Sequence, residues 1–130
     1  MGVGEFNQIA EAVAMGVDMF DCVIPTRLAR NGAAVTRKGR YPLRGADNKE
    51  GLMPIEEGCQ CYACRNFTRA YLRHLLNADE ILGIVLLTIH NIYCYMTFMA
   101  DIRSSIENNT FGKMLENLRG KRSRSAEIGN

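Results

Sequence analysis

Three cysteines lie close together in this 130-residue chain, at Cys59, Cys61 and Cys64, and a histidine follows at His90. Thiolate and imidazole groups are the ligands that zinc prefers, and short spacings allow their donor atoms to converge on one tetrahedral ion. Four protein ligands leave no position open for water, so such a site organises a fold and performs no reaction itself. The pattern therefore predicts a closed structural zinc site.

The three cysteines supply three of the four ligands, and their spacing does not identify the fourth. The chain has two histidines, and His74 lies in a helix-like stretch where it is compatible with a core or a surface position. We favour His90, and three crowded cysteines without a metal are the alternative. The other thiols, Cys22 and Cys94, are interpreted as small buried apolar residues. An odd number of crowded cysteines does not fit a secreted disulfide framework, so a reducing compartment is expected.

A carboxylate interrupts the apolar segment Val17 to Ile24, at Asp21. A buried charge is costly unless it is paired or hydrogen-bonded, so Asp21 either lies near the exposed end of this segment or belongs to a site. The alternative, equally supported by the residues alone, is that Asp21 ties down neighbouring backbone amides. Asp18, at the start of the segment, is interpreted as a cap.

Arg27 and Arg30 lie three residues apart and share one face of a helical turn. Two guanidinium groups beside a carboxylate can hold phosphates or the edges of a base. From spacing alone, a solvated basic face is the simpler interpretation. The net charge is only +2, but local basic patches are compatible with a polyanionic partner. Their members are Arg27, Arg30, Arg37, Lys38, Arg40, Arg44, Arg119, Lys121, Arg122 and Arg124.

The elements that must position these residues alternate between helix and strand. Asn7 to Met15 has helical spacing, with Asn7 as N-cap and Gly16 as the stop, and Val17 to Ile24 is typical of a short buried strand ended by Pro25. This alternation predicts an α/β fold. The next expected elements are a helical turn over 27–31, a hairpin pairing 33–36 with 41–43 and a polar loop over 45–58.

The sequence pattern predicts that the second half of the chain is mostly helical. Phe67 to Asn77 has an amphipathic pattern, and a second helical region is expected from Glu80 to about Glu107, with a bend near 88–91. After Leu118 the sequence is basic and poor in apolar residues, which predicts a frayed or disordered tail. The longest apolar run, Ile81 to Ile89, is too short to span a bilayer, and no signal peptide is visible.

Length and composition set bounds on the fold. Hydrophobic residues make up 47% and charged residues 23% of the chain, which is ordinary for a globular protein. A chain of 130 residues can form one domain with a modest core, but an eight-stranded α/β barrel needs roughly 250 residues. A complete barrel of that kind is therefore excluded.

Three blocks of the sequence are similar to one known family: DMFDCVIPTRLARNG, PIEEGCQCYACRNFTRAYLRHLLNADEILG and LTIHN. From Met1 to about Ile106 the chain resembles the C-terminal third of bacterial-type tRNA-guanine transglycosylase, the queuine tRNA-ribosyltransferase family. The resemblance implies a zinc-containing TIM-barrel variant. It also implies the exchange of guanine at the wobble position of tRNA for a 7-deazaguanine, queuine or its precursor, through a covalent enzyme–RNA intermediate in queuosine modification.

The resemblance also implies roles for particular residues. Asp21 matches the nucleophile that attacks the ribose anomeric carbon, a step for which a carboxylate is suited, as in retaining glycosidases. The ligands of one zinc ion per chain are matched by Cys59, Cys61, Cys64 and His90. The residues that match RNA-binding segments are Gly2, Val3, Gly4, Glu5, Phe6, Asn7, Gln8, Thr26, Arg27, Leu28, Ala29 and Arg30.

By the same resemblance the α/β chain has three regions. Residues 1–44 are the last part of an incomplete barrel, with the nucleophile strand and the wobble-recognition loop. Residues 45–107 form an inserted zinc-binding subdomain and C-terminal helices, and residues 108–130 are a C-terminal segment and basic tail, partly disordered. Most barrel strands, a second catalytic aspartate and most of the base pocket are expected upstream of Met1. The turn Glu5-Phe6-Asn7 departs from the proline-containing turn usual in the family.

We therefore expect a cytoplasmic glycosyltransferase fragment that is inactive alone. Its expected partners are tRNA, through the anticodon loop, a 7-deazaguanine base, and either a second copy or the missing N-terminal portion; no membrane is expected. The alternative is a non-catalytic zinc-binding and tRNA-binding module or partner subunit. A third possibility is an inert gene remnant.

Overall fold

The computed structural model of the protein describes residues 2–127, with side chains described through residue 120. The chain divides into two compact units, each described here by itself. The first comprises Met1–Val23 with Thr97–Asn130, and the second comprises Ile24–Met96. The long helix α5 (Ile81–Glu107) contributes its first part to the second unit and its last part to the first.

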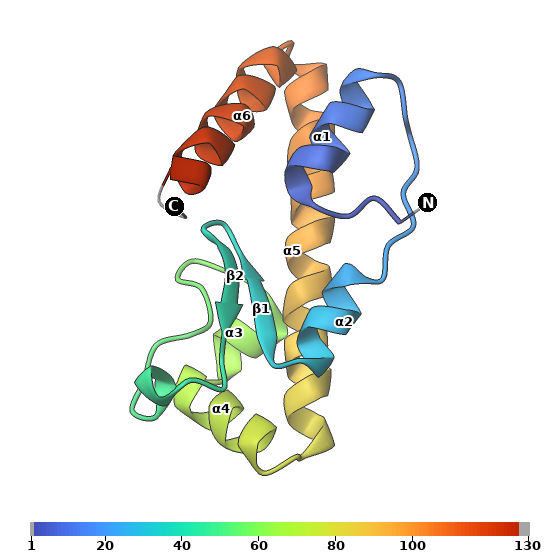
Figure 1. Ribbon diagram of the computed structural model, residues 1–130. Helices are drawn as coiled ribbons and strands as arrows, with labels where there is room; N and C mark the ends of the chain where they lie inside the picture. Colours follow the sequence, from blue (N-terminus) through green and yellow to red (C-terminus); the bar gives the residue numbers. More distant parts are fainter. Residues whose placement is uncertain (1, 128–130) are drawn as a thin grey trace. The chain divides into compact units, whose positions relative to one another are not determined.

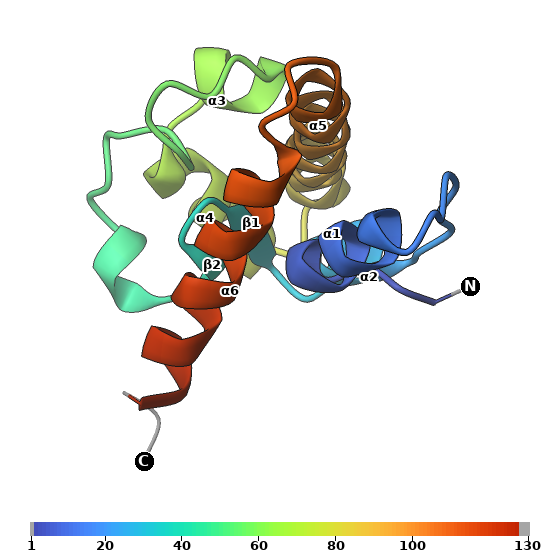
Figure 2. The same cartoon turned by 90° about the horizontal axis from the view of Figure 1, so that it is seen from above.

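The second unit is a small mixed helix and sheet structure built against the first part of α5. Figures 1 and 2 both show α3, α4 and the β-hairpin on the same side of α5. The elements before α5 are α2 (Ile24–Arg30), β1 (Ala33–Thr36), β2 (Gly39–Pro42), the 3-10 helix η1 (Ala46–Asn48), α3 (Tyr62–Asn66) and α4 (Arg69–Asn77).

Strands β1 and β2 form an antiparallel hairpin in which Thr36 pairs with Gly39 and Ala33 with Pro42. The Thr36 hydroxyl donates a hydrogen bond to the Gly39 carbonyl at 2.8 Å. Gly39 has a φ of 113°, a conformation that side chains disfavour. The predicted hairpin is confirmed, with its second strand beginning at Gly39 instead of Tyr41.

Helix α4 follows the amphipathic pattern predicted for Phe67 to Asn77, and the separate helix α3 precedes it. Thr68 is the N-cap of α4, and its hydroxyl accepts a hydrogen bond from the Tyr71 amide. A Cβ atom added at Gly83 would lie 2.9 Å from the Leu75 Cβ. Glycine at this position therefore allows α5 to approach α4 closely, where a larger residue would force the two helices apart.

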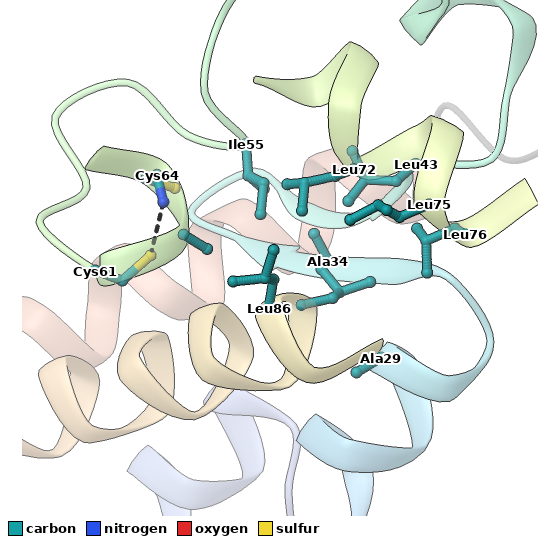
Figure 3. Packing of buried hydrophobic residues seen from close by; sticks show 12 residues of the cluster. Ala29, Ala34, Leu43, Ile55, Cys61, Cys64, Leu72, Leu75, Leu76 and Leu86 are labelled. Carbon is teal, nitrogen blue, oxygen red and sulfur yellow. Dashed lines mark hydrogen bonds between the residues drawn. The ribbon is translucent and has the colours of Figure 1, made fainter. Parts of the chain in front are cut away.

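The core of the second unit is a cluster of aliphatic side chains. In Figure 3, Leu43, Ile55 and Leu72 point towards Ala34 of β1 and Leu86 of α5. All five are buried. Because these residues come from five separate elements or loops, burying them fixes the hairpin and α4 against α5.

The first unit contains α1 (Phe6–Ala14), the last part of α5 and α6 (Phe111–Glu127). Phe6 stacks on Phe98 of α5 with ring centroids 4.3 Å apart, and Figure 1 shows α1 beside this part of α5. The guanidinium of Arg119 on α6 donates two hydrogen bonds to the Glu11 carboxylate of α1, at 2.6 and 2.7 Å. The N-cap of α1 is Glu5, so the prediction of Asn7 at that position is wrong.

The strand predicted from Val17 to Ile24 is not formed. Residues 17–23 have no regular secondary structure, and Ile24 begins α2. Met19 is 87% exposed and Val23 is 52% exposed, so the segment is not buried either. A strand needs a neighbour for its backbone hydrogen bonds. Within residues 2–127 the sheet has two strands, β1 and β2, and neither pairs with this segment.

The C-terminal region also differs from the sequence-based expectation. Helix α6 continues to Glu127, through residues that we expected to be frayed, and residues 128–130 lie outside the described part of the chain. Helix α5 is continuous over its 27 residues, with no break at the bend expected near 88–91. The described residues form a mixed helix and sheet structure, so the α/β prediction is confirmed only in the presence of both kinds of element, since the sheet that they form is one antiparallel hairpin.

Helix α5 is long and apolar enough to cross a membrane by length and composition, with a mean hydropathy of 1.6 over its most apolar window. The core helix of a soluble protein passes the same test. Leu86, Leu87, His90 and Asn91 of this helix are fully or almost fully buried. Their burial shows that one side of α5 serves as packing surface for the second unit.

Candidate metal centre and nucleophile

The three cysteines and His90 form one cluster, and their donor atoms all lie within 4.8 Å of one another. The Nδ1 atom of His90 is 3.8 Å from the sulfur of Cys59, 3.4 Å from that of Cys61 and 3.3 Å from that of Cys64. Zinc–sulfur bonds of about 2.3 Å and zinc–nitrogen bonds of about 2.0 Å at a tetrahedral angle place sulfur and nitrogen about 3.5 Å apart. The cluster therefore fits a zinc ion with four protein ligands.

Local structure explains how the cysteines converge. Cys61 is the N-cap of α3, and its sulfur accepts a hydrogen bond from the Cys64 amide at 3.3 Å, the dashed line in Figure 3. This turn places the two sulfurs on one side of the short helix. Cys61 and Cys64 are buried and Cys59 is half-buried, so the site is closed by protein.

The ring of His90 is oriented by strand β1. Its Nε2–H donates a hydrogen bond to the Val35 carbonyl at 2.9 Å, which leaves the lone pair of Nδ1 facing the sulfurs. A second hydrogen bond of this kind fixes the tautomer of a histidine that binds a metal. His74 lies exposed on α4, outside the cluster. The structure thus groups His90, and not His74, with the three cysteines.

The thiols of the cluster influence one another's ionisation. A hydrogen bond from the Cys64 thiol lowers the pKa of Cys61 to about 4. The same interaction raises the pKa of Cys64, and burial raises the pKa of Cys59. Without a cation the cluster therefore favours one thiolate that is stabilised by neighbouring thiols. A bound dication is what would allow all three sulfurs to ionise together.

The two remaining cysteines lie outside this ligand set. The Cys94 thiol donates a hydrogen bond to the Val35 carbonyl at 3.4 Å and lies 3.5 Å from Nε2 of His90, the nitrogen that faces away from the sulfurs. Burial raises the pKa of Cys94 to about 12, so its thiol is neutral. Both Cys94 and Cys22 are half-buried, less enclosed than the sequence led us to expect.

Asn91 is a structural residue that the sequence reasoning missed. It is completely buried, and its Oδ1 atom accepts a hydrogen bond from the Val35 amide at 2.8 Å. Its Nδ2 atom donates to the carbonyls of Pro25 and Ala33, at 2.9 and 3.1 Å. The sequence contained one indication of this role. Asn91 is a polar residue next to His90 in the apolar first half of a long helix, where a buried amide needs hydrogen-bond partners.

Asp21 lies in the irregular segment of the first unit and is exposed. Its backbone carbonyl accepts a hydrogen bond from the Gly2 amide at 3.0 Å, so the start of the glycine-containing segment Gly2 to Gly4 lies beside it. The interpretation that placed Asp21 within a buried strand is wrong in this structure. Because the carboxylate is exposed, the desolvation argument for a site at Asp21 does not hold either.

The residues that matched RNA-binding segments occupy two places in the chain. In the first unit, Glu5 caps α1, while Phe6, Asn7 and Gln8 form its first turn. In the second unit, residues 26–30 lie within α2, where Ala29 is buried and both Arg27 and Arg30 are exposed. The helical turn predicted for the two arginines is confirmed as part of a longer helix.

The described residues define a class of protein, namely a mixed helix and sheet protein in which three cysteines and one histidine form a closed ligand set for a metal ion. The sequence matches the family described as queuine tRNA-ribosyltransferase over residues 1–124. The chain belongs to this family.

Individual relatives agree with the family assignment. The chain is 53% identical over 116 residues to the queuine tRNA-ribosyltransferase of Pelotomaculum thermopropionicum, covering 89% of this chain and 30% of that protein. It is 52% identical over 111 residues to the enzyme of the same name from Natranaerobius thermophilus, covering 85% of this chain and 30% of that protein. For the Thermotoga neapolitana protein of that name, the identity is 49% over 120 residues, with 89% and 32% covered. The chain thus spans about 30% of the length of these relatives.

Proposed function

We propose that this chain is the C-terminal part of a tRNA-guanine transglycosylase, a cytoplasmic glycosyltransferase. Its reaction would exchange guanine at the wobble position of tRNA for a 7-deazaguanine, queuine or its precursor, in queuosine modification. The observation that carries the proposal is the identity of about 50% to queuine tRNA-ribosyltransferases over almost the whole chain. The family match over residues 1–124 spans the segment of Asp21 and the metal cluster.

In the proposed reaction Asp21 is the nucleophile. A carboxylate oxygen attacks the anomeric carbon of the ribose, the glycosidic bond to guanine breaks, and guanine leaves with the bonding electrons and takes up a proton. A ring nitrogen of the incoming base then loses its proton and displaces the carboxylate, which leaves with the bonding electrons, and a glycosidic bond is restored. The exposure of Asp21 supports this role, because a nucleophile must be able to reach the ribose of a large substrate.

Arg27 and Arg30 are the proposed contacts to the wobble region. They lie three residues apart on α2 and are exposed, and neither guanidinium forms an ion pair with any described residue. Guanidinium groups in this state can bind phosphates or stack on and hydrogen-bond to unpaired bases. The first turn of α1 and Gly2 to Gly4 would supply further RNA contacts.

Zinc would be structural in this function. Cys59, Cys61 and Cys64 would hold it together with His90, and the ion would join the α3 region to α5. No ligand position is left for water or substrate, so the chemistry of the exchange falls to the carboxylate.

The surface of α5 supports the view that a longer polypeptide completes the protein. A row of exposed apolar residues runs along α5 within the second unit at spacings of three and four, on one helical face. Its members are Ile81, Val85, Ile89, Ile92 and Met96. Such a row is usually covered by protein. We propose that the rest of a TIM-barrel variant covers it, supplied by an N-terminal portion, and that the complete enzyme forms a homodimer.

A complementation assay tests the proposal. The 130-residue chain is mixed with a separately produced N-terminal two-thirds of the Pelotomaculum thermopropionicum relative and with tRNA that carries labelled guanine. We expect label release only when both proteins are present, and its loss with Asp21→Ala. Asp18→Ala is the matched control, because Asp18 is also exposed in the same irregular segment.

Three outcomes would contradict the proposed function. RNA binding without exchange, when the two portions form a stable complex, would favour the alternative of a non-catalytic zinc-binding and tRNA-binding module. Exchange that persists in Asp21→Ala would exclude Asp21 as the nucleophile. Insolubility of the chain even with zinc and the N-terminal portion would favour a gene remnant.

A further inference from the structure

Two neighbouring side chains of α5 hold strand β1 from the side opposite β2. His90 and Asn91 are both completely buried. His90 donates to the Val35 carbonyl, while Asn91 accepts from the Val35 amide. Val35 is opposite Arg40 in the hairpin, and alternate residues of an antiparallel strand direct their polar groups away from the partner strand. Adjacent residues of α5 thus satisfy both backbone groups of one strand residue.

Asn91 extends this link to helix α2. Its Nδ2 atom donates to the Ala33 carbonyl of β1 and to the Pro25 carbonyl in the first turn of α2. The amide therefore uses both of its N–H groups as well as its oxygen. Helix α2 has seven residues, and a helix this short is not stable in water without tertiary contacts. The bond from Asn91 to Pro25 is a fixed point for the helix that carries Arg27 and Arg30.

The metal cluster is adjacent to this link in sequence, because its ligand His90 immediately precedes Asn91. A ligand bond at Nδ1 of His90 restricts the ring, whose other nitrogen is bonded to Val35. The position of α5 relative to β1 is then set at His90, and Asn91 transmits that position to Pro25. The cysteine sulfurs do not contact β1 through this link, because they lie on the Nδ1 side of the imidazole ring and Val35 lies on the Nε2 side.

We propose that Asn91 is a positioning residue that couples occupancy of the metal site to the placement of α2, and through α2 to Arg27 and Arg30. The RNA-binding consequence rests on the proposed function, whereas the coupling itself does not. A structural metal would in this way order the proposed recognition helix without contacting RNA.

The sharpest variant is Asn91→Asp, which has nearly the same shape. The carboxylate can still accept from the Val35 amide, but it can no longer donate to the Pro25 and Ala33 carbonyls. The matched control is Asn77→Asp on α4, where the exposed amide donates only a long hydrogen bond of 3.4 Å to the Arg44 carbonyl. Both variants of the whole 130-residue chain are compared with the unchanged chain, each with zinc and after chelation.

Amide hydrogen exchange and metal content are the measurements. We expect zinc to slow exchange in residues 24–31 of the unchanged chain and of Asn77→Asp. In Asn91→Asp we expect one bound zinc, slow exchange around the cysteines, and exchange in residues 24–31 about tenfold faster, because a hydrogen bond of this kind contributes on that scale. The proposal is overturned if α2 in the unchanged chain does not respond to zinc. It is equally overturned if zinc-loaded Asn91→Asp protects α2 fully.

A second variant tests the coupling if Asn91→Asp does not bind zinc. Asn91→Ser removes the reach to Pro25 without adding a charge. Full zinc with unprotected α2 in this variant supports the coupling, whereas full zinc with protected α2 contradicts it. Loss of zinc from both variants also contradicts it, because Asn91 would then be part of the metal site instead of a link beyond it.

Binding of a tRNA anticodon stem-loop separates the coupling from the proposed function. If the chain binds this RNA, zinc-loaded Asn91→Asp should bind it about tenfold more weakly than Asn77→Asp. If the unchanged chain does not bind RNA while α2 responds to zinc through Asn91, the coupling stands and the assigned role of Arg27 and Arg30 is wrong.

Discussion

The metal-binding unit and the unit that carries Asp21 differ in how their candidate sites are built. In Ile24–Met96 the cluster is assembled from a loop, α3 and α5, and the fourth ligand is oriented by β1. In the other unit Asp21 lies in an exposed segment without regular structure. The comparison teaches that the metal ligand set is assembled by packed elements within the described residues, whereas these residues do not enclose the carboxylate of Asp21.

Removing a metal ligand should have the largest effect, and it should be confined to the metal-binding unit. We expect His90→Ala to lose most bound zinc and the ordered structure around the cysteines, because zinc binding to such sites contributes on the order of 10 kcal/mol to folding. Metal analysis and amide exchange measure both effects. His74→Ala is the matched control and should retain one zinc.

Two results of these measurements would contradict the contrast between the two units or the ligand assignment. If chelation were to speed exchange equally in α1 and in the cysteine loop, the two units would not be independent in their response to the metal. Retention of full zinc by His90→Ala would overturn the ligand assignment itself.

The next largest effect should come from the core of the metal-binding unit. Leu72 is fully buried among Leu43, Ile55 and other aliphatic side chains, so Leu72→Ala should lower the free energy of unfolding by about 2–5 kcal/mol. Denaturant unfolding of the zinc-loaded chain measures this. Leu82→Ala, at a position that is 43% exposed, should cost far less, and equal losses would show that α4 does not form the core.

Zinc affinity should fall as the pH falls through the neutral range. The pKa values of Cys59 and Cys64 are raised, so both thiols carry protons that zinc must displace. Cys61, with a pKa of about 4, is already a thiolate at neutral pH and adds no dependence there. Each displaced proton changes affinity about tenfold per pH unit.

Competition with a chelator between about pH 6 and pH 8 tests this dependence, after correction for the chelator's own protonation. A flat affinity over that range would mean that the cysteines are already ionised before the metal binds. Cys22→Ser should leave the profile unchanged, because Cys22 is not among the four clustered ligands.

The smallest effect on stability is expected at Asp21. Because its side chain is exposed in an irregular segment, Asp21→Ala should change the free energy of unfolding by no more than about 0.5 kcal/mol, although it should abolish exchange in the complemented enzyme. Thermal unfolding with and without the N-terminal portion measures this. A large loss of stability in the isolated chain would indicate a structural carboxylate, the alternative that the residues left open.

Much of the local structure could be predicted because its causes are local. The stop at Gly16, the hairpin around Lys38-Gly39, the Phe67 to Asn77 helix and the end of α5 all follow from turn residues or from hydrophobic periodicity. The failed strand at 17–23 shows the limit. An apolar run predicts burial, but pairing partners decide whether a strand forms, and the described chain offers none there.

The sequence alone determined the three cysteine ligands of the metal site, because three thiols at short spacing have few other uses, and it favoured His90 as the fourth ligand. It also determined the family, through the residues around Asp21 and the cysteines. Tertiary structure decided which histidine completes the cluster, since only the packing of α5 on β1 brings His90 to the sulfurs and leaves His74 exposed. It also decided the role of Asn91, whose three hydrogen-bond partners lie more than 50 residues away in sequence. Contacts over such separations depend on the packing of whole elements, which no local pattern of residues encodes.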